Sequence, residues 1–216
     1  MLGLFDSGIG GLNTVRYIKA NLHDIDLVYK IDRANAPYGI KSEKELIEIV
    51  ENNVHELQDR GAEKILIACC TASTVHDKLA NEYKSASIPI IKPISKHAMR
   101  VSKTGRIGVI ATDRTVSKHA FRDSMPYCSV SEIASQELVK LIDDGLNDNT
   151  VTEKEKQLLS RIISPLKGKH IDTLILGCTH FPALKLSFSE ICRPIGIKHI
   201  IDSAIVGAEA IRNSIE

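Results

Sequence analysis

The sequence predicts an α/β protein made of two pseudo-symmetric α/β lobes, each built on a mainly parallel central sheet. Three observations support this prediction: short apolar runs alternate with helical stretches, the alternation restarts near residue 93, and two strands end in matching Cys-Thr turns. Strands separated by helices are typical of parallel sheets joined by βαβ crossovers. We expect residues 1–92 with 203–216 to form the first lobe and residues 93–202 to form the second.

In the first lobe, apolar runs predict four strands, at residues 1–5, 25–30, 64–68 and 89–91. A first helix is expected over residues 11–22. A second helix is expected from Ser42 to about Arg60, because Ser42 and Glu45 have the spacing of a capping box. We expect Lys92-Pro93 to be a hinge between the lobes, since proline disfavours helix in the residue before it.

In the second lobe the same reasoning predicts strands at residues 106–111, 129–133, 173–176 and 198–201. Helices are expected at residues 115–124, 136–143, 152–166 and 183–192. A last helix from Ser203 to the end of the chain is assigned to the first lobe. The final strand therefore leads the chain back to the lobe in which it began.

The composition predicts an ordinary soluble globular protein. The chain has 216 residues, of which 43% are hydrophobic and 25% are charged, and its net charge is +1. This charge and the absence of Trp argue against nucleic acid or a membrane surface as a partner. No segment reaches the length of a membrane span, and Met1–Asp6 lacks the basic region of a signal peptide. Five cysteines, an odd number without a disulfide pattern, favour a reducing cytoplasm.

The most informative motifs are two cysteines that each end an apolar run and stand at the start of a Thr-containing turn. Cys69 stands in Ile65–Ser73, and Cys178 stands in Leu174–His180. A helix N-terminus favours anions, so a thiol there is expected to ionise more easily. One buried cysteine most often only packs. Two of them at the carboxyl ends of strands, where open α/β sheets bind ligands, favour two sulfur bases around one substrate.

A glycine-rich turn follows the first strand, in the sequence Asp6-Ser7-Gly8-Ile9-Gly10-Gly11. Its glycines let a ligand approach backbone N–H groups closely, which suits an anion. A dinucleotide fingerprint would need glycine where Asn13 stands, so a nucleotide site is weakly supported. A tight strand-to-helix turn without a ligand is the alternative. The adjacent Cys69-Cys70 pair has no zinc-site spacing, and no metal is expected.

Together these motifs resemble those of glutamate racemases along essentially the whole chain. Phe5–Leu12 resembles the opening motif of that family, and Asp32 with Pro37-Tyr38-Gly39 and Ser42 resembles its next signature. Ala68–Ser73 is similar to the first catalytic cysteine motif, and Gly177–Pro182 is similar to the second. Segments 108–115, 141–145 and 201–203 also fit in order.

The resemblance implies cofactor-independent interconversion of L- and D-glutamate at a site in the cleft between two lobes. It implies that Cys69 and Cys178 are the two bases, that Asp6 assists Cys69, and that His180 and Asp143 support Cys178. The resemblance also implies a group of residues that hold the carboxylates and amine of the substrate: Ser7, Pro37, Tyr38, Gly39, Cys70, Thr71, Thr115 and Thr179. The implied setting is cytoplasmic, with D-glutamate supplied to peptidoglycan synthesis and cell shape, and a homodimer is the candidate assembly.

The residue types suit this chemistry. Inverting Cα requires a proton to leave one face and another to arrive at the opposite face, so two groups must flank the carbon. A thiolate is a compact base whose reference pKa of about 8.5 is adjustable by its surroundings. Without a cofactor as electron sink, preorganised donors in a water-poor site must stabilise the carbanionic state.

Two positions depart from the family pattern near the substrate. Cys70 stands where asparagine is usual, and a thiol cannot replace an amide as a hydrogen-bonding partner. Arg33 stands where threonine is common and adds a positive charge. Two alternatives therefore remain open: a racemase for another acidic amino acid such as aspartate, and a non-catalytic relative that binds a ligand or partner.

Overall fold

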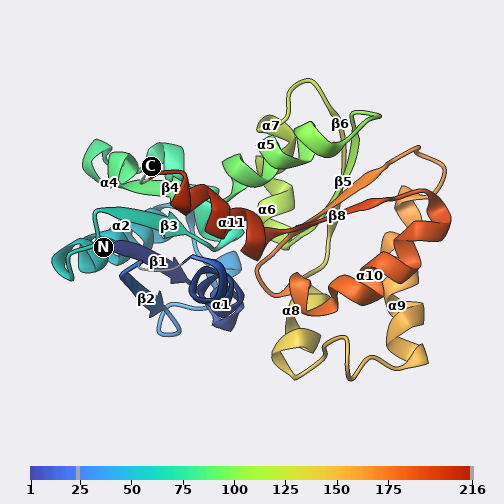
Figure 1. The fold of residues 1–216 in the computed structure, drawn as a ribbon, viewed down its shortest axis with the longest axis horizontal. Helices are drawn as coiled ribbons and strands as arrows, with labels where there is room; N and C mark the ends of the chain where they lie inside the picture. The colour runs from blue at the N-terminus through green and yellow to red at the C-terminus, as the bar shows by residue number, and fades with distance from the viewer. Residues whose placement is uncertain (23–24, 215–216) are drawn as a thin grey trace. The chain divides into compact units, whose positions relative to one another are not determined.

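The computed structural model describes residues 1–22 and 25–214, and the chain divides into two compact units. Unit 1 comprises Met1–Pro93 with Ala204–Glu216, and unit 2 comprises Ile94–Ser203. Each unit contains one four-stranded sheet in which all neighbouring strands are parallel (Figure 1). The predicted fold class, two α/β lobes with parallel sheets, is confirmed.

The sheet of unit 1 has the strand order β2-β1-β3-β4. Its strands are β1 (Leu2–Asp6), β2 (Leu27–Ile31), β3 (Lys64–Ile67) and β4 (Ser87–Pro89). The helices of this part of the chain are α1 (Leu12–Asn21), α2 (Glu43–Asp59), α3 (Cys70–Ser73), α4 (Asn81–Ala86) and α11 (Ser203–Arg212). The predicted capping box starts α2, since Ser42 and Glu45 exchange both hydrogen bonds. A buried cluster including Phe5, Leu46 and Ile65 forms the core.

The sheet of unit 2 repeats this topology in the order β6-β5-β7-β8. Its strands are β5 (Arg106–Ala111), β6 (Ser129–Ala134), β7 (Thr173–Gly177) and β8 (His199–Asp202). The helices are α5 (Ile91–Val101), α6 (Asp113–Ser117), α7 (Ala120–Asp123), α8 (Gln136–Asp143), α9 (Glu153–Ile163) and α10 (Lys185–Cys192). Helices α9 and α10 pack side by side (Figure 1). The core cluster includes Ile110, Leu159 and Phe181.

The equivalent strands of the two units match in order, because β1, β2, β3 and β4 correspond to β5, β6, β7 and β8. Strands β3 and β7 hold the same place in their sheets, next to the central strand β1 or β5. Each of these two strands leads directly into one of the cysteine motifs. The pseudo-symmetry expected from the sequence is therefore present in the topology, and it gives the two thiols equivalent positions.

The junction predicted at residues 89–93 differs from the structure. The fourth strand was expected over residues 89–91 but ends at Pro89, and α5 begins at Ile91. Lys92-Pro93 was expected to be a hinge but lies within the first turn of α5. Proline is tolerated there because the backbone N–H groups of a first helical turn have no intrahelical acceptor. The chain passes from unit 1 to unit 2 inside this helix, after Pro93.

Three predicted helices are shorter or more broken than expected. The helix predicted over residues 115–124 is two short helices, α6 and α7, separated at His119, whose φ of 50° lies in the left-handed region. Single 3₁₀ turns containing Pro165 and Pro182 replace the end of one predicted helix and the start of another. The last two residues of the final predicted helix lie outside the described residues.

Candidate active site

The first thiol stands at the carboxyl end of strand β3. Strand β3 ends at Ile67, and Cys69 is the N-cap residue of the four-residue helix α3, with φ −70° and ψ 118°. The apolar run Ile65–Ala68 is fully buried. Because Cys69 follows this run directly, the packed strand fixes its position at the carboxyl edge of the sheet. The Cys69 side chain is itself almost enclosed, with 6% of the residue exposed.

A carboxylate and a hydroxyl from the neighbouring strand accompany this thiol. Strand β1 ends at Asp6, which is fully buried, and Ser7 follows it. The Ser7 Oγ lies 3.5 Å from the Cys69 Sγ and donates to Asp6 Oδ1 over 3.4 Å. With that donation made, the Ser7 oxygen can accept the thiol proton of Cys69. The three side chains therefore form a chain from thiol to carboxylate through one hydroxyl.

The glycine-rich turn brings its backbone close to the same carboxylate. A Cβ on Gly11 would lie 2.8 Å from both the Asp6 Cβ and the Tyr29 hydroxyl, which is closer than side-chain atoms approach. The Tyr29 hydroxyl donates to the Gly8 carbonyl over 3.2 Å. Glycine at position 11 is thus required by close packing around Asp6. The turn's anion-binding role stays a prediction.

The pKa of Cys69 is raised to about 11, mainly by burial and then by the negative charge of Asp6. Hydrogen bonds from Ser7 and from the backbone of Ala72 and Thr71 act in the opposite direction but are smaller. The sequence-based expectation that a helix N-terminus would ease ionisation is therefore wrong for Cys69. The amides do act in the predicted direction, but α3 has only four residues, and burial and Asp6 outweigh them.

This electrostatic balance predicts how Cys69 reacts with an alkylating reagent. Because only the thiolate is nucleophilic, its alkylation rate should rise about tenfold per pH unit until the pH approaches its pKa near 11. The Asp6→Asn variant removes the like charge, lowers the pKa, and should be alkylated several-fold faster at pH 8. Iodoacetamide labelling followed by mass spectrometry of the Cys69 peptide measures both rates. Slower labelling of Asp6→Asn would contradict this account.

The second thiol stands at the equivalent end of strand β7, immediately after Gly177. Cys178 is 7% exposed, and its Sγ lies 3.5 Å from Nδ1 of His180. The other ring nitrogen, Nε2, lies 3.0 Å from Oδ1 of Asp143 at the end of α8. In the neutral ring with its proton on Nε2, His180 donates to Asp143 and can accept the Cys178 proton at Nδ1. Here too a thiol is linked to a carboxylate through one intermediate group.

Asp143 was singled out from the sequence although it stands in an Asp-Asp pair typical of a solvated helix face. Its side chain is indeed 52% exposed, yet one oxygen contacts His180. A carboxylate at the outer nitrogen orients an imidazole ring and fixes its tautomer. The structure therefore brings together Cys178, His180 and Asp143, as it brings together Cys69, Ser7 and Asp6.

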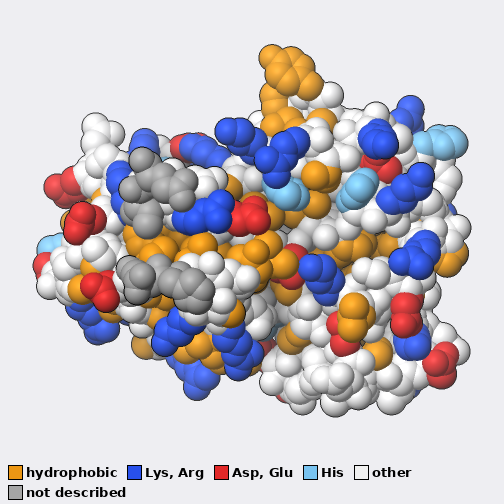
Figure 2. Space-filling view, in the orientation of Figure 1, with side chains coloured by type: hydrophobic (Ala, Val, Ile, Leu, Met, Phe, Trp, Pro, Cys, Tyr) orange, Lys and Arg blue, Asp and Glu red, His pale blue; other side chains and the backbone are white. Residues whose placement is uncertain are grey.

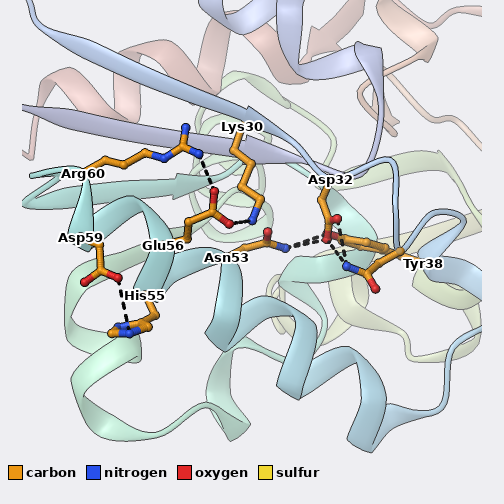
Figure 3. Close-up of polar contacts among 9 residues, drawn as sticks. Lys30, Asp32, Tyr38, Asn53, His55, Glu56, Asp59 and Arg60 are labelled. Atoms are coloured by element: carbon orange, nitrogen blue, oxygen red, sulfur yellow. Dashed lines mark hydrogen bonds and ion pairs between the residues drawn. The ribbon is translucent and has the colours of Figure 1, made fainter.

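A buried polar network holds the Pro37-Tyr38-Gly39 segment in unit 1 (Figure 3). The Tyr38 hydroxyl donates to Asp32 Oδ2 over 2.7 Å, and the Asn53 amide of α2 donates to both of these oxygens over 2.9 Å. Asn35 also donates to both carboxylate oxygens of Asp32. These hydrogen bonds lower the pKa of Asp32 although its burial opposes ionisation. Asp32 thus stays charged and anchors the Tyr38 ring.

Sequence reasoning missed Asn53, which lies 2% exposed in the middle of α2. The sequence signal that could have indicated Asn53 is its place on the apolar face of the predicted helix, which also carries Leu46, Val50, Val54 and Leu57. Nearby on the same helix, Glu56 pairs with Lys30 and Arg60 (Figure 3). Asn53 links α2 to the Tyr38 segment, so it acts as a positioning residue for that segment.

We expect the Asn53→Leu variant to lose about 2 kcal/mol of unfolding free energy, because it leaves the Asp32 carboxylate with fewer donors in a buried place. Asn53→Asp should cost more, since it places two carboxylates in contact. Urea denaturation monitored by circular dichroism measures these losses. The exposed Asn52→Leu substitution on the same helix is the matched control and should change stability by less than about 0.5 kcal/mol.

The remaining substrate-binding candidates lie in two groups. In unit 1, Cys70 and Thr71 are buried in α3, while Pro37 and Gly39 are exposed on either side of the buried Tyr38. In unit 2, Thr179 is buried beside Cys178. Thr115 is fully buried in α6, and its hydroxyl lies 2.9 Å from that of Thr112, the N-cap residue of this helix. Their contact with a substrate stays a prediction.

The described residues contain neither a candidate metal site nor a candidate membrane-spanning helix. Over residues 1–22 and 25–214, no group of three His, Cys, Asp or Glu side chains is arranged to hold a metal ion. Within the same residues, no helix combines the length and the apolar composition needed to cross a membrane.

Comparison with known proteins identifies the family. The model of the family described as Asp/Glu/Hydantoin racemase matches residues 13–211. A glutamate racemase of Desulforudis audaxviator is 37% identical over 216 residues, covering 98% of this chain and 77% of that protein.

Solved structures agree with this match. A glutamate racemase isoform from Bacillus anthracis superposes with a TM-score of 0.86 at 28% identity, covering 100% of this chain and 81% of the other. Glutamate racemase from Francisella tularensis, solved in complex with D-glutamate, also gives a TM-score of 0.86 at 28% identity, over 99% and 80% of the two chains.

The chain therefore belongs to the Asp/Glu/Hydantoin racemase family. It is an isomerase of the amino-acid racemase type, and its similarity to glutamate racemases extends over nearly its whole length.

Proposed function

We propose that this protein interconverts L- and D-glutamate without a cofactor, using Cys69 and Cys178 as the two acid–base groups. The observation that carries the proposal is the repeated arrangement of a buried thiol at the end of the third strand of each parallel sheet. Each thiol is linked to a carboxylate through one group, Ser7 for Cys69 and His180 for Cys178. The similarity to glutamate racemases, one of them solved with D-glutamate, supports glutamate as the substrate.

In the proposed reaction, one sulfur is a thiolate and removes the Cα proton, leaving its electron pair on the substrate as a carbanionic state. The other sulfur is a thiol and delivers a proton to the opposite face of Cα. The two roles reverse with the direction of the reaction. Because the pKa of Cys69 is near 11, this thiol is almost entirely protonated at neutral pH before substrate binds. Cys69 is thus prepared to act as the acid in one direction and must lose its proton to act in the other.

The neighbouring groups provide a route for that proton. Ser7 can accept the Cys69 proton while donating its own to Asp6, and His180 can accept the Cys178 proton at Nδ1. Asp143 then stabilises the imidazolium that forms. Hydroxyl groups and backbone N–H groups near each thiol, including Ser7 and Thr179, suit the carboxylates of an acidic amino acid.

Incubation with L-glutamate in deuterium oxide tests the proposal. We expect loss of the Cα proton signal in the NMR spectrum and decay of optical rotation to zero, with the same end point from D-glutamate. L-Aspartate is the comparison substrate and should react far more slowly. Faster exchange of aspartate would assign the activity to another acidic amino acid, and no exchange with either by the folded protein would favour a binding protein without turnover.

The physiological part of the proposal is that the D-glutamate is made in the cytoplasm and enters peptidoglycan. A bacterial strain that lacks its own glutamate racemase and needs external D-glutamate provides the test. Expression of this chain should remove the requirement, whereas a catalytically inactive variant should not. Continued dependence on D-glutamate despite soluble, active protein would contradict this role.

A further inference from the structure

A shallow cavity of about 600 Å³ lies in unit 2 at the amino-terminal edge of its sheet. It is lined by residues just before β5 and β7 and by residues just before and at the start of β8, among them Lys103, His170, Asp172, Lys198 and His199. Strand β7 runs from Thr173 beside this cavity to Gly177, which precedes Cys178. The cavity is therefore at the opposite end of the sheet from the candidate catalytic thiol of this unit, and it belongs to no function described above.

The lining of this cavity, called here the basic cavity, has more basic than acidic side chains. It contains two lysines and two histidines but a single carboxylate, Asp172. Lys103 and Lys198 are exposed, and within the described part of the chain neither ammonium group makes an ion pair. Figure 2 shows Lys, Arg and His side chains, with some Asp and Glu among them, over the upper part of unit 2 on the face in view. The whole chain has a net charge of only +1, so this positive charge is local.

The single carboxylate, that of Asp172, is buried and accepts four hydrogen bonds from the protein. Asp172 is 8% exposed and accepts from Ser102 Oγ over 2.6 Å, from the backbone N–H of Lys103 over 2.7 Å and from that of Thr104 over 3.0 Å. Thr173 donates to it as well, over 2.9 Å. With its oxygens occupied by these four donors, Asp172 forms no ion pair with Lys103 or Lys198 among the described residues. The two lysine ammonium groups therefore remain available to a ligand.

Asp172 also makes the basic cavity rigid. Its side chain holds the loop that carries Lys103, and its backbone oxygen accepts from the N–H groups of Lys198 and His199 over 2.8 and 3.0 Å. One residue thus ties together the two loops that carry both lysines. At the rim, Gly168 and Gly196 have φ values of +73° and +92° and nothing within 4 Å of a Cβ position, so a ligand can approach the backbone there.

We propose that the basic cavity binds a small, multiply charged phosphate compound, of the diphosphate class. The volume of the basic cavity is that of a small-molecule site rather than of a long groove that binds a polymer. The two lysine ammonium groups can pair with two negative charges, and the two histidine rings can add hydrogen-bond donors, whereas a single amino-acid carboxylate carries only one negative charge. The lining has no Phe, Tyr or Trp on which nucleic-acid bases could stack, which disfavours a nucleic-acid strand.

Calorimetric titration of the full chain with pyrophosphate, at constant ionic strength, tests the proposal. We expect saturable 1:1 binding, weakened at least about tenfold in the Lys103→Glu/Lys198→Glu variant. The matched control is Lys154→Glu/Arg161→Glu, which makes the same charge change at another cavity of unit 2 that also contains Glu137 and Glu155. This control should bind pyrophosphate as the unaltered protein does.

Several outcomes would overturn the proposal. These are absence of saturable binding, equal weakening in the control variant, and tight binding of a short DNA duplex at this face when pyrophosphate does not bind. Lys103→Ala/Lys198→Ala serves as a second variant if the glutamate variant fails to fold, with thermal unfolding as the check. Racemisation is not the readout, so failure here leaves the proposed function standing.

Discussion

Replacing either Cys69 or Cys178 by serine is expected to abolish net racemisation of glutamate, with a loss of at least about 10²–10⁴-fold. A serine hydroxyl is a far weaker acid than a thiol, so it is not available as a base near neutral pH. Each variant keeps one intact thiol, which can still remove a proton and return a deuteron on its own face. We therefore expect slow Cα exchange without inversion, from one enantiomer in Cys69→Ser and from the other in Cys178→Ser.

The measurement is NMR of L- and D-glutamate in deuterium oxide, with each enantiomer supplied separately. Cys128→Ser is the matched control, because this cysteine is only partly buried and lies in neither thiol site; its racemisation rate should be unchanged. The two-thiol mechanism is wrong if both variants exchange the same enantiomer or if either racemises normally. Loss of activity in Cys70→Ser, with activity retained in Cys69→Ser, would move the first base to the adjacent thiol.

The largest expected effect on stability is that of Asp172→Ala, which should lower the free energy of unfolding by about 3 kcal/mol at pH 7. The substitution leaves the backbone donors of Lys103 and Thr104 without their acceptor in a partly buried loop. It also frees Ser102, whose hydroxyl donates to the same carboxylate. Urea denaturation monitored by circular dichroism measures the loss, and the exposed Asp123→Ala variant should change stability by less than about 0.5 kcal/mol.

We expect the stabilising effect of the Asp172 carboxylate to depend on pH. Its pKa is lowered to about 2 because the hydrogen bonds from Ser102, Lys103 and Thr104 together outweigh burial. A lowered pKa stabilises the fold above the unfolded value near 3.8, and this contribution is lost as the pH falls through about 2. The difference in stability between the unaltered protein and Asp172→Ala should thus shrink by about 2 kcal/mol between pH 5 and pH 2. A difference independent of pH would contradict this role.

Local signals in the sequence predicted most of the elements. The apolar runs at residues 106–111 and 173–176 became β5 and β7, and the Ser42–Glu45 spacing became the capping box of α2. The predicted helices were wrong where the local preference of a residue did not decide its conformation. Proline at position 93 indicated a break but stands in the first turn of α5, where its missing N–H has no consequence. The left-handed conformation of His119 divides a segment that looked like one helix.

The candidate site shows the same division between local and distant information. The positions of Cys69 and Cys178 at strand ends were predictable, because each follows a short apolar run. The direction of the pKa shift of Cys69 was not, because it is set mainly by burial in the folded protein and then by the charge of Asp6 on another strand. Asn53 and Asp172 were missed for a related reason: each acts through hydrogen bonds to segments distant in sequence.

The sequence by itself determined the α/β class, the two cysteine turns and the family to which the chain belongs, because these depend on residue patterns within short windows. The resemblance also implied Asp6, His180 and Asp143 as partners of the thiols, and only the tertiary structure decided how these groups are connected, through Ser7 to Cys69 and through His180 to Cys178. Pairing of β1 with β3 sets Asp6 and Ser7 beside Cys69, and the end of α8 sets Asp143 beside His180. Electrostatic and hydrogen-bonding interactions depend on distance in space, which the chain establishes only when its distant segments pack together.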